Sequence, residues 1–221
     1  SDTTFPDKLI SYFSILSMLT RQLINIPVHL GLDHLPNIYC GVAVFVLLPL
    51  YIMCSKVNAR EKIGKCVILL IFLTAFNLNI PNYIWHGMHF PNSLPCRQSF
   101  IYIFFLLAMC YEAVINLKNS TNRQLGASLW IAIGLLLIME ELFINSETEY
   151  SFKSVYISGI FILIYGLLMF IHNNAKFKIP VVLMLTFSVS IIECTMNMDA
   201  TGIGTTSRTS YLLDYDAVKT V

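Results

Sequence analysis

Residues 86–97 bring together the side chains best suited to binding an anion. The segment contains His86, His89 and Arg97 and lies between two long apolar runs. An arginine guanidinium can hold a phosphate through two parallel hydrogen bonds. Histidines three residues apart share one face if the segment is helical, and they can bind a phosphate or carry a proton. We call this segment the His86–Arg97 corner.

The residues just before Arg97 predict the start of a helix. Asn92 or Ser93 can cap a helix, and Pro95 is tolerated in a first turn because its missing N–H breaks no helical bond. The free N–H groups and the positive end of the helix dipole would then lie beside Arg97. We therefore expect the corner to form an anion site at the membrane surface. The alternative is that Arg97 only anchors the helix among lipid headgroups and that the histidines are structural.

Glu193 is a further candidate because it lies inside an apolar run. A charged side chain is costly to bury in a membrane, so such a residue is a functional candidate by default. We expect Arg97 or a histidine to be its partner. Glu112, near the end of another apolar run, is expected to be paired or to extend toward water.

The composition is that of an integral membrane protein. Of 221 residues, 56% are hydrophobic and 12% are charged, and the mean hydropathy is +0.69. Soluble domains carry about 25% charged residues. A net charge of +1 gives no electrostatic footprint for nucleic acid, so no such partner is expected. The six cysteines show no CxxC spacing and are interpreted as packing residues. No metal site is expected, and the need for a divalent cation is left open.

Six apolar runs are predicted to span the membrane. They cover residues 37–54, 66–80, 99–117, 125–145, 155–172 and 179–198. Pro49 predicts a kink in the first. Residues 9–26 are also apolar, but polar side chains recur there at helical spacing, which favours a helix in the membrane interface over one that spans it. These polar residues are Ser14, Ser17, Arg21 and Asn25.

The basic residues predict the orientation, because cytoplasmic loops carry an excess of Lys and Arg. The loops after the first, third and fifth runs hold eight of them: Lys56, Arg60, Lys62, Lys65, Lys118, Arg123, Lys176 and Lys178. The loops after the second and fourth runs hold only Arg97 and Lys153. Both ends of the chain and the His86–Arg97 corner are therefore expected outside.

These patterns predict an all-α transmembrane helical bundle of about six spans plus an outer interfacial helix. Residues 1–36 form an extracytoplasmic segment with the interfacial helix, and residues 37–198 form the transmembrane domain. Residues 199–221 begin another extracytoplasmic segment. The polar beginning and end suggest an internal fragment of a longer protein.

The order and spacing of several motifs resemble the YfhO family of bacterial membrane proteins along nearly the whole chain. The most specific part is the corner. The motifs are Pro36–Gly41, Arg60–Lys62, Trp85–Gly87, Pro91–Asn92, Arg97–Phe100, Glu193–Asn197, Ser207–Arg208 and Tyr211. Cys96 and Leu94 stand where the family pattern would place an aromatic residue.

The resemblance implies a multi-pass protein of the bacterial cell membrane with a GT-C type glycosyltransferase fold. Such enzymes use polyprenyl-phosphate-linked sugars on the outer face to glycosylate cell-envelope polymers such as teichoic acids. Their catalytic acidic residue usually lies in a first large outer loop, which is outside this chain, so no catalytic residue is assigned. The resemblance leaves His86, His89, Asn92, Arg97 and Glu193 as the expected lipid-phosphate site.

Two other functions remain open from the sequence. A transporter or flippase of lipid-linked sugars could use the same anion site. Broken helices at matching positions of two repeats would favour transport, and only Pro49 suggests one. A structural membrane subunit would use the corner as an anchor alone.

Overall fold

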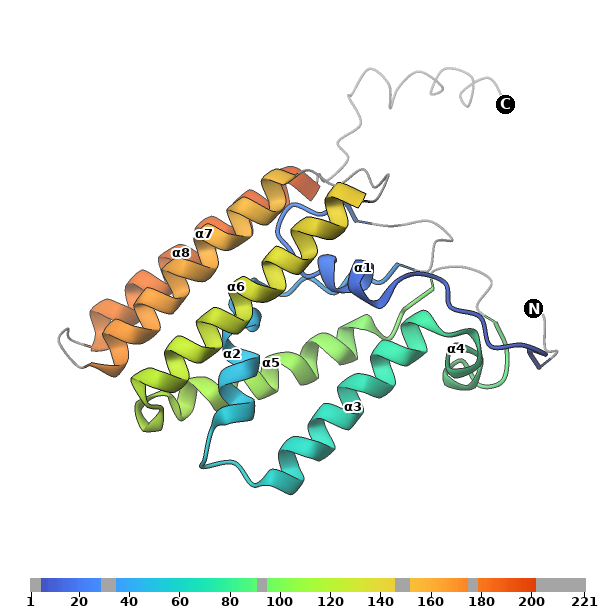
Figure 1. Cartoon of the computed structure of the whole chain (residues 1–221), viewed down its shortest axis with the longest axis horizontal. Coiled ribbons are helices and arrows are strands. Elements are labelled where there is room, and N and C mark those ends of the chain that lie inside the picture. The colour runs from blue at the N-terminus through green and yellow to red at the C-terminus, as the bar shows by residue number, and fades with distance from the viewer. Residues whose placement is uncertain (1–4, 29–34, 91–94, 146–151, 175–178, 202–221) are drawn as a thin grey trace, which may run out of the picture.

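The computed structural model describes residues 5–28, 35–90, 95–145, 152–174 and 179–201, and the named elements in these ranges are all helices (Figure 1). This agrees with the predicted all-α class. The helices are α1 (Ile15–Thr20), α2 (Val44–Met53), α3 (Ala59–Asn77), α4 (Asn79–Trp85), α5 (Ser99–Ile115), a 3-10 turn (Leu117–Asn119), α6 (Asn122–Asn145), α7 (Phe152–Asn173) and α8 (Ile179–Thr201).

Three helices are long and apolar enough to cross a membrane. Their apolar segments are Asn122–Glu141, Phe152–Asn173 and Ile179–Met198. A hydrocarbon core about 30 Å thick needs about 20 helical residues. The three helices lie side by side, with α7 between α6 and α8 (Figure 1). Gly166 of α7 lets α6 approach closely, because a Cβ there would come within 2.9 Å of Leu129 Cδ1.

Six spans are not confirmed, because the first three predicted runs form shorter or more polar helices. α2 has 10 residues and is about 15 Å long, half of what a span needs. Gly41 adopts a φ of 97° in the non-helical stretch before it, so the helix cannot begin at residue 37. α3 begins in charged sequence and ends at Asn77, and α5 has 17 residues.

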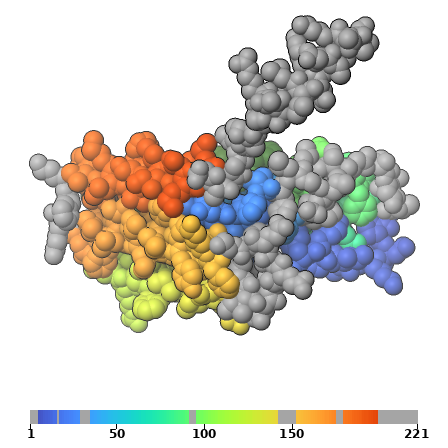
Figure 2. Space-filling model, turned by 90° about the horizontal axis from the view of Figure 1, so that it is seen from above, coloured from blue at the N-terminus to red at the C-terminus, as the bar shows by residue number. Residues whose placement is uncertain are grey.

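α2 occupies the centre of the fold. Most of its side chains are buried, Ile52 being exposed, and it packs against α5 and α6 (Figure 1). A helix that is hydrophobic all round is expected to be buried in this way. By contrast, α8 presents a mostly exposed apolar surface on the face shown in Figure 2. Its exposed side chains include Leu183, Met184, Phe187, Ile191 and Ile192. In a membrane this surface faces lipid or further helices.

The predicted interfacial helix over residues 9–26 is wrong in extent and in environment. Only Ile15–Thr20 is helical, and Arg21 of the supposed polar face is 3% exposed. The start of the segment is held instead by two buried asparagines at the junction of α3 and α4. The Asn77 side chain accepts a hydrogen bond from the N–H of Phe13, and the Asn79 side chain accepts one from Ile10. These bonds to residues far along the chain, rather than helical bonds, hold the backbone there.

Glu112 of α5 is paired, as expected. Lys65 of α3 donates to its carboxylate and, at 2.6 Å, to Glu61. Burial opposes the charged form of Lys65, but the hydrogen bonds to Glu112 and Glu61 outweigh it and raise the pKa of Lys65 above its usual value. This cluster ties α3 to α5 at the end of the molecule predicted to be cytoplasmic.

Candidate functional site

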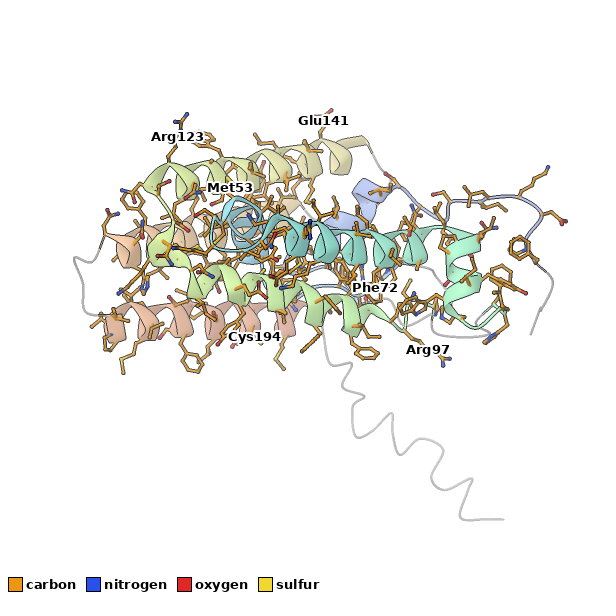
Figure 3. All side chains as sticks on the ribbon, turned by 90° about the horizontal axis from the view of Figure 1, so that it is seen from below. Met53, Phe72, Arg97, Arg123, Glu141 and Cys194 are labelled. Carbon is orange, nitrogen blue, oxygen red and sulfur yellow. The ribbon has the colours of Figure 1, made fainter. Side chains whose placement is uncertain are left out.

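Arg97 does not lie in the first turn of a helix. α5 begins at Ser99, with Gln98 as its N-cap, so the predicted helix start near Pro95 is wrong. Cys96 has a φ of 60°, which places a turn immediately before Arg97. The Arg97 side chain is exposed and lies at the edge of the molecule (Figure 3). Asn92, the other polar residue expected at this site, lies outside the described residues.

His86 and His89 come together at the end of α4. Their ring centroids are 6.4 Å apart and the rings are nearly perpendicular. His86 Nδ1 lies 2.8 Å from the carbonyl oxygen of Asn82. A carbonyl only accepts, so Nδ1 carries the proton, and the neutral ring can only accept at Nε2. In the neutral ring, Nε2 of His86 can therefore accept a hydrogen bond but cannot donate one.

Gln98 adds a polar group to the corner that the sequence did not single out. Its side chain is 3% exposed, and neither its amide nitrogen nor its amide oxygen has a hydrogen-bond partner. Buried polar groups are nearly always paired, so an unpaired amide calls for an explanation. It lies directly beside Arg97, at the start of α5.

Glu193 lies on α8, is 3% exposed, and is surrounded by hydrogen-bond donors. Its Oε1 accepts from the hydroxyl of Tyr39 at 2.7 Å and from the backbone N–H of Val42 at 2.8 Å. Its Oε2 accepts from the hydroxyl of Tyr165 at 2.6 Å. These three hydrogen bonds engage both oxygens of the carboxylate.

The expected pairing of Glu193 with Arg97 or a histidine is therefore wrong. Within the described ranges, its hydrogen-bond donors are all neutral groups. Arg97 lies well away from Cys194, the residue that follows Glu193 (Figure 3). The corner and Glu193 are two separate places in the molecule.

Gly41 explains how the backbone reaches Glu193. Its φ of 97° is open to glycine and costly for other residues. A Cβ at this position would lie 3.8 Å from Oε1 of Glu193, so the turn passes directly over the carboxylate. The turn leads directly into α2, and the N–H of Val42 just before that helix donates to the carboxylate.

Arg21 is the second buried charged residue on this side of the molecule. It donates through Nε to the carbonyl of Pro36 at 3.2 Å and through Nη1 to that of Pro27 at 2.7 Å. Nη2 donates to Oδ1 of Asn37 at 2.6 Å. The guanidinium therefore joins the segment after α1 to the segment before α2. Sequence reasoning assigned Arg21 to an interfacial stripe, although an arginine within an apolar stretch was a signal for burial too.

Polar side chains of α7 and α8 hold the backbone beside Arg21. The hydroxyl of Ser158 accepts from the N–H of Ile24 at 3.2 Å, and Oδ1 of Asn197 accepts from the N–H of Asn25 at 2.9 Å. Asn25 has a φ of 61°, which asparagine tolerates better than most residues. The long helices thereby fix the position of Arg21.

A cavity of about 160 Å³ opens next to these groups. We call it the Arg21 cavity. Its lining residues are Arg21, Ile26, Val28, Asn37, Ile38, Tyr39 and Asn197. Tyr39 both lines the cavity and donates to Glu193, so the carboxylate holds one wall of it. A guanidinium, two amides and a phenol around one space can bind an anion or a hydroxyl-rich group.

The residues described by the structure contain no group of three or more His, Cys, Asp or Glu side chains that could hold a metal ion. Polar contacts in and around the Arg21 cavity come from arginine, amide and hydroxyl groups, which suit organic and phosphate ligands.

Comparison with known proteins finds one description that fits the chain. The family model described as "Bacterial membrane protein YfhO" matches residues 3–221. No curated protein matches, and neither does any solved structure.

Proposed function

The chain belongs to the YfhO family of bacterial membrane proteins, and we propose that it is the carrier-binding part of a membrane glycosyltransferase. The enzyme transfers a sugar from a polyprenyl-phosphate carrier on the outer face of the cell membrane to an envelope polymer such as teichoic acid. The observation that carries this proposal is the Arg21 cavity, which combines a buried guanidinium with two amides that can hydrogen-bond a sugar, beside three membrane-length helices.

The position of the cavity suits a substrate that is anchored in lipid. Asn197 lies in the last turns of α8, at the end of the apolar segment Ile179–Met198. The predicted orientation puts this end outside. A polyprenyl phosphate keeps its chain in the membrane and its anion at the surface, and the proposal puts the cavity at that level.

Arg21 supplies the charge that the reaction needs. When the sugar leaves the carrier, negative charge grows on the phosphate, and a fixed cation stabilises it without reorganisation. The bonds from Arg21 to Pro36, Pro27 and Asn37 hold the guanidinium in place. The amides of Asn37 and Asn197 and the hydroxyl of Tyr39 are groups that can hydrogen-bond sugar hydroxyls.

Glu193 acts as a positioning residue in this proposal. Its oxygens already accept three hydrogen bonds, which suits holding Tyr39 in place better than removing a proton. The catalytic acidic residue is proposed to lie in a part of the protein outside this chain.

The His86–Arg97 corner remains a proposed contact for the carrier phosphate at the headgroup level. Arg97 is exposed there, and the unpaired amide of Gln98 offers a further donor. Asn92 and the two histidines complete the proposed set. The corner would receive the carrier before its sugar reaches the Arg21 cavity.

The test is donor turnover by the full-length protein in membranes, with a radiolabelled polyprenyl-phosphate hexose and cell-wall polymer as acceptor. Arg21→Lys keeps the positive charge but loses the planar guanidinium, which can bind two oxygens at once. We therefore expect at least a tenfold loss of turnover per folded protein. The matched control is Arg123→Lys, an exposed position at the start of α6. Equal turnover of both variants would refute the role of Arg21.

One observation favours transport as a second candidate function. α2 is half the length of a span and follows non-helical backbone that contacts Glu193. Transporters often build binding sites from such broken helices. A flippase would move the labelled lipid between leaflets of a proteoliposome without any acceptor, whereas a glycosyltransferase would release labelled polymer only when the acceptor is present.

A further inference from the structure

We propose that the apolar pocket between α2, α5 and α6 binds the hydroxyl of a neutral long-chain lipid, with that hydroxyl donating to Oε1 of Gln22. The pocket holds about 110 Å³. It is distinct from the Arg21 cavity and shares none of its lining residues. The lining residues that matter here are Gln22, Phe45, Pro49, Tyr102, Leu106 and Leu135.

Gln22 is the reason to expect a hydrogen-bond donor in the pocket. Its side chain is 4% exposed, and its Nε2 donates to Sγ of Cys40 at 3.1 Å. Its Oε1 is buried and has no hydrogen-bond partner. An unpaired buried acceptor is costly, so a ligand that donates to it gains affinity.

Pro49 leaves a second acceptor of the same pocket, the carbonyl oxygen of Phe45, without its usual helical donor. It lies inside α2 and has no N–H, so it cannot make the usual helical bond to the carbonyl of Phe45. Both residues line the pocket. At Phe45 and Pro49, α2 therefore offers the pocket a carbonyl that can accept a hydrogen bond and no N–H that pairs with it.

The rest of the lining decides what kind of molecule carries the donor. Apart from Gln22 and Tyr102, the lining side chains are apolar, and none is charged. A charged ligand would lose its hydration without a counter-ion. A water molecule could donate to Gln22, but it would leave the largely apolar remainder of the pocket without contacts. A single hydroxyl on a hydrocarbon chain satisfies both requirements.

The size and surroundings of the pocket fit one end of a chain. A dry protein cavity of about 150 Å³ binds benzene, so about 110 Å³ suits a hydroxyl and its first few carbons. Leu48, Pro49 and Leu135 are only half-buried, so the pocket is not sealed. The remainder of the chain would leave between the helices into the surrounding lipid.

Two kinds of membrane lipid carry such a hydroxyl: an isoprenoid alcohol and a diacylglycerol. The shared chemistry is a neutral hydroxyl on an apolar body. The two sources differ in shape, because the isoprenoid is a single branched chain and the diacylglycerol hydroxyl stands beside two ester-linked chains.

The experiment measures thermal stabilisation of the purified full-length protein by farnesol, by farnesyl methyl ether and by dioctanoylglycerol. The ether keeps the chain and loses the donor. We expect a saturable rise in Tm with farnesol or dioctanoylglycerol, and about tenfold weaker binding of the ether than of farnesol. Whichever of farnesol and dioctanoylglycerol binds more tightly identifies the source of the hydroxyl, and a failure of both to bind overturns the proposal.

Two variants locate the effect. Gln22→Leu removes the acceptor, so farnesol and its ether should bind equally. Leu106→Phe fills the pocket and should weaken both, whereas Leu183→Phe on the exposed face of α8 should change neither. Equal binding of alcohol and ether to the wild-type protein, or unchanged binding to Leu106→Phe, would refute the site even if Gln22→Leu fails to fold.

Discussion

Two arginines of this protein lie in contrasting surroundings. Arg97 is exposed in a turn before α5, and Arg21 is 3% exposed, with bonds to three oxygens of two segments. The corner around Arg97 has the more suggestive sequence, with two histidines and two prolines nearby. Arg21 has the more developed site, because a cavity and fixed polar partners surround it. Residue types alone therefore pointed to the less enclosed of the two places.

The largest expected difference between the two places is in stability. Arg21→Ala leaves the carbonyls of Pro36 and Pro27 and the amide of Asn37 without their donor. At roughly 1–3 kcal/mol for each buried group left unpaired, we expect a loss of roughly 3 kcal/mol or more. Arg97→Ala should stay within about 0.5 kcal/mol of wild type, as exposed substitutions usually do. Thermal unfolding in detergent measures the stability of both variants. Equal losses of stability would contradict the proposed difference between the two sites.

The next largest effect concerns Glu193 and separates its role from that of an ordinary acidic residue. Glu193→Leu removes the acceptor of Tyr39, Tyr165 and the Val42 N–H, which should cost roughly 2–4 kcal/mol and lower turnover further by releasing Tyr39. Glu193→Gln keeps an acceptor and should recover part of both.

The matched control is Glu141→Leu on the exposed side of α6 (Figure 3). If the control loses as much stability and turnover per folded protein as Glu193→Leu, the buried carboxylate has no special role.

Arg97 gives the third prediction, and it concerns binding rather than folding. If the corner holds a carrier phosphate, Arg97→Ala should weaken donor binding by about 1.5–3 kcal/mol, ten- to a hundredfold. Lysine should restore only part of this, because a point charge does not reproduce the planar fork. The measurement is the KM for the lipid donor in membranes, normalised to protein level. A lysine variant indistinguishable from wild type would make Arg97 a headgroup anchor.

The smallest predicted effect tests the backbone that reaches Glu193. Gly41→Ala places a side chain on a residue with φ of 97°, which should destabilise the protein by about 1–2 kcal/mol. Gly134→Ala, in open space within α6, should be neutral or stabilising by up to about 1 kcal/mol. A comparison of the two melting temperatures checks this, and no difference between them would show that the turn at Gly41 carries no strain.

The long-range features of the site could not be predicted from local patterns. Glu193 was recognisable as unusual because ionisable residues inside apolar runs are rare. Its partners were not recognisable, because Tyr39 lies 154 residues away and Tyr165 lies 28 residues away. Hydrogen bonds over such separations depend on how the helices pack, and periodicity in the sequence reports only the nearest turns.

The first hundred residues show a related limit. A polar stripe on an apolar segment is compatible with two structures. One is a helix whose polar face meets water, and the other is a buried segment whose polar groups bond to other parts of the protein. Residues 9–26 form the buried segment, because their backbone N–H groups donate to side chains of other helices: Asn77, Asn79, Ser158 and Asn197. The apolar run at 37–54 likewise yields a short α2, because the turn at Gly41 is held by a hydrogen bond from the N–H of Val42 to Glu193 of α8.

What the sequence by itself determined is the membrane class, the helical fold, the three helices α6 to α8 that are long and apolar enough to cross a membrane, and the pairing of Glu112. These follow from apolar length and from the cost of an unpaired charge, and both are properties of a segment alone. Only the tertiary structure decided that Arg21 is buried, that Glu193 is held by tyrosines, and that cavities open beside Arg21 and Gln22. Each of these requires groups from distant segments to meet, and which groups meet depends on the packing of the whole chain.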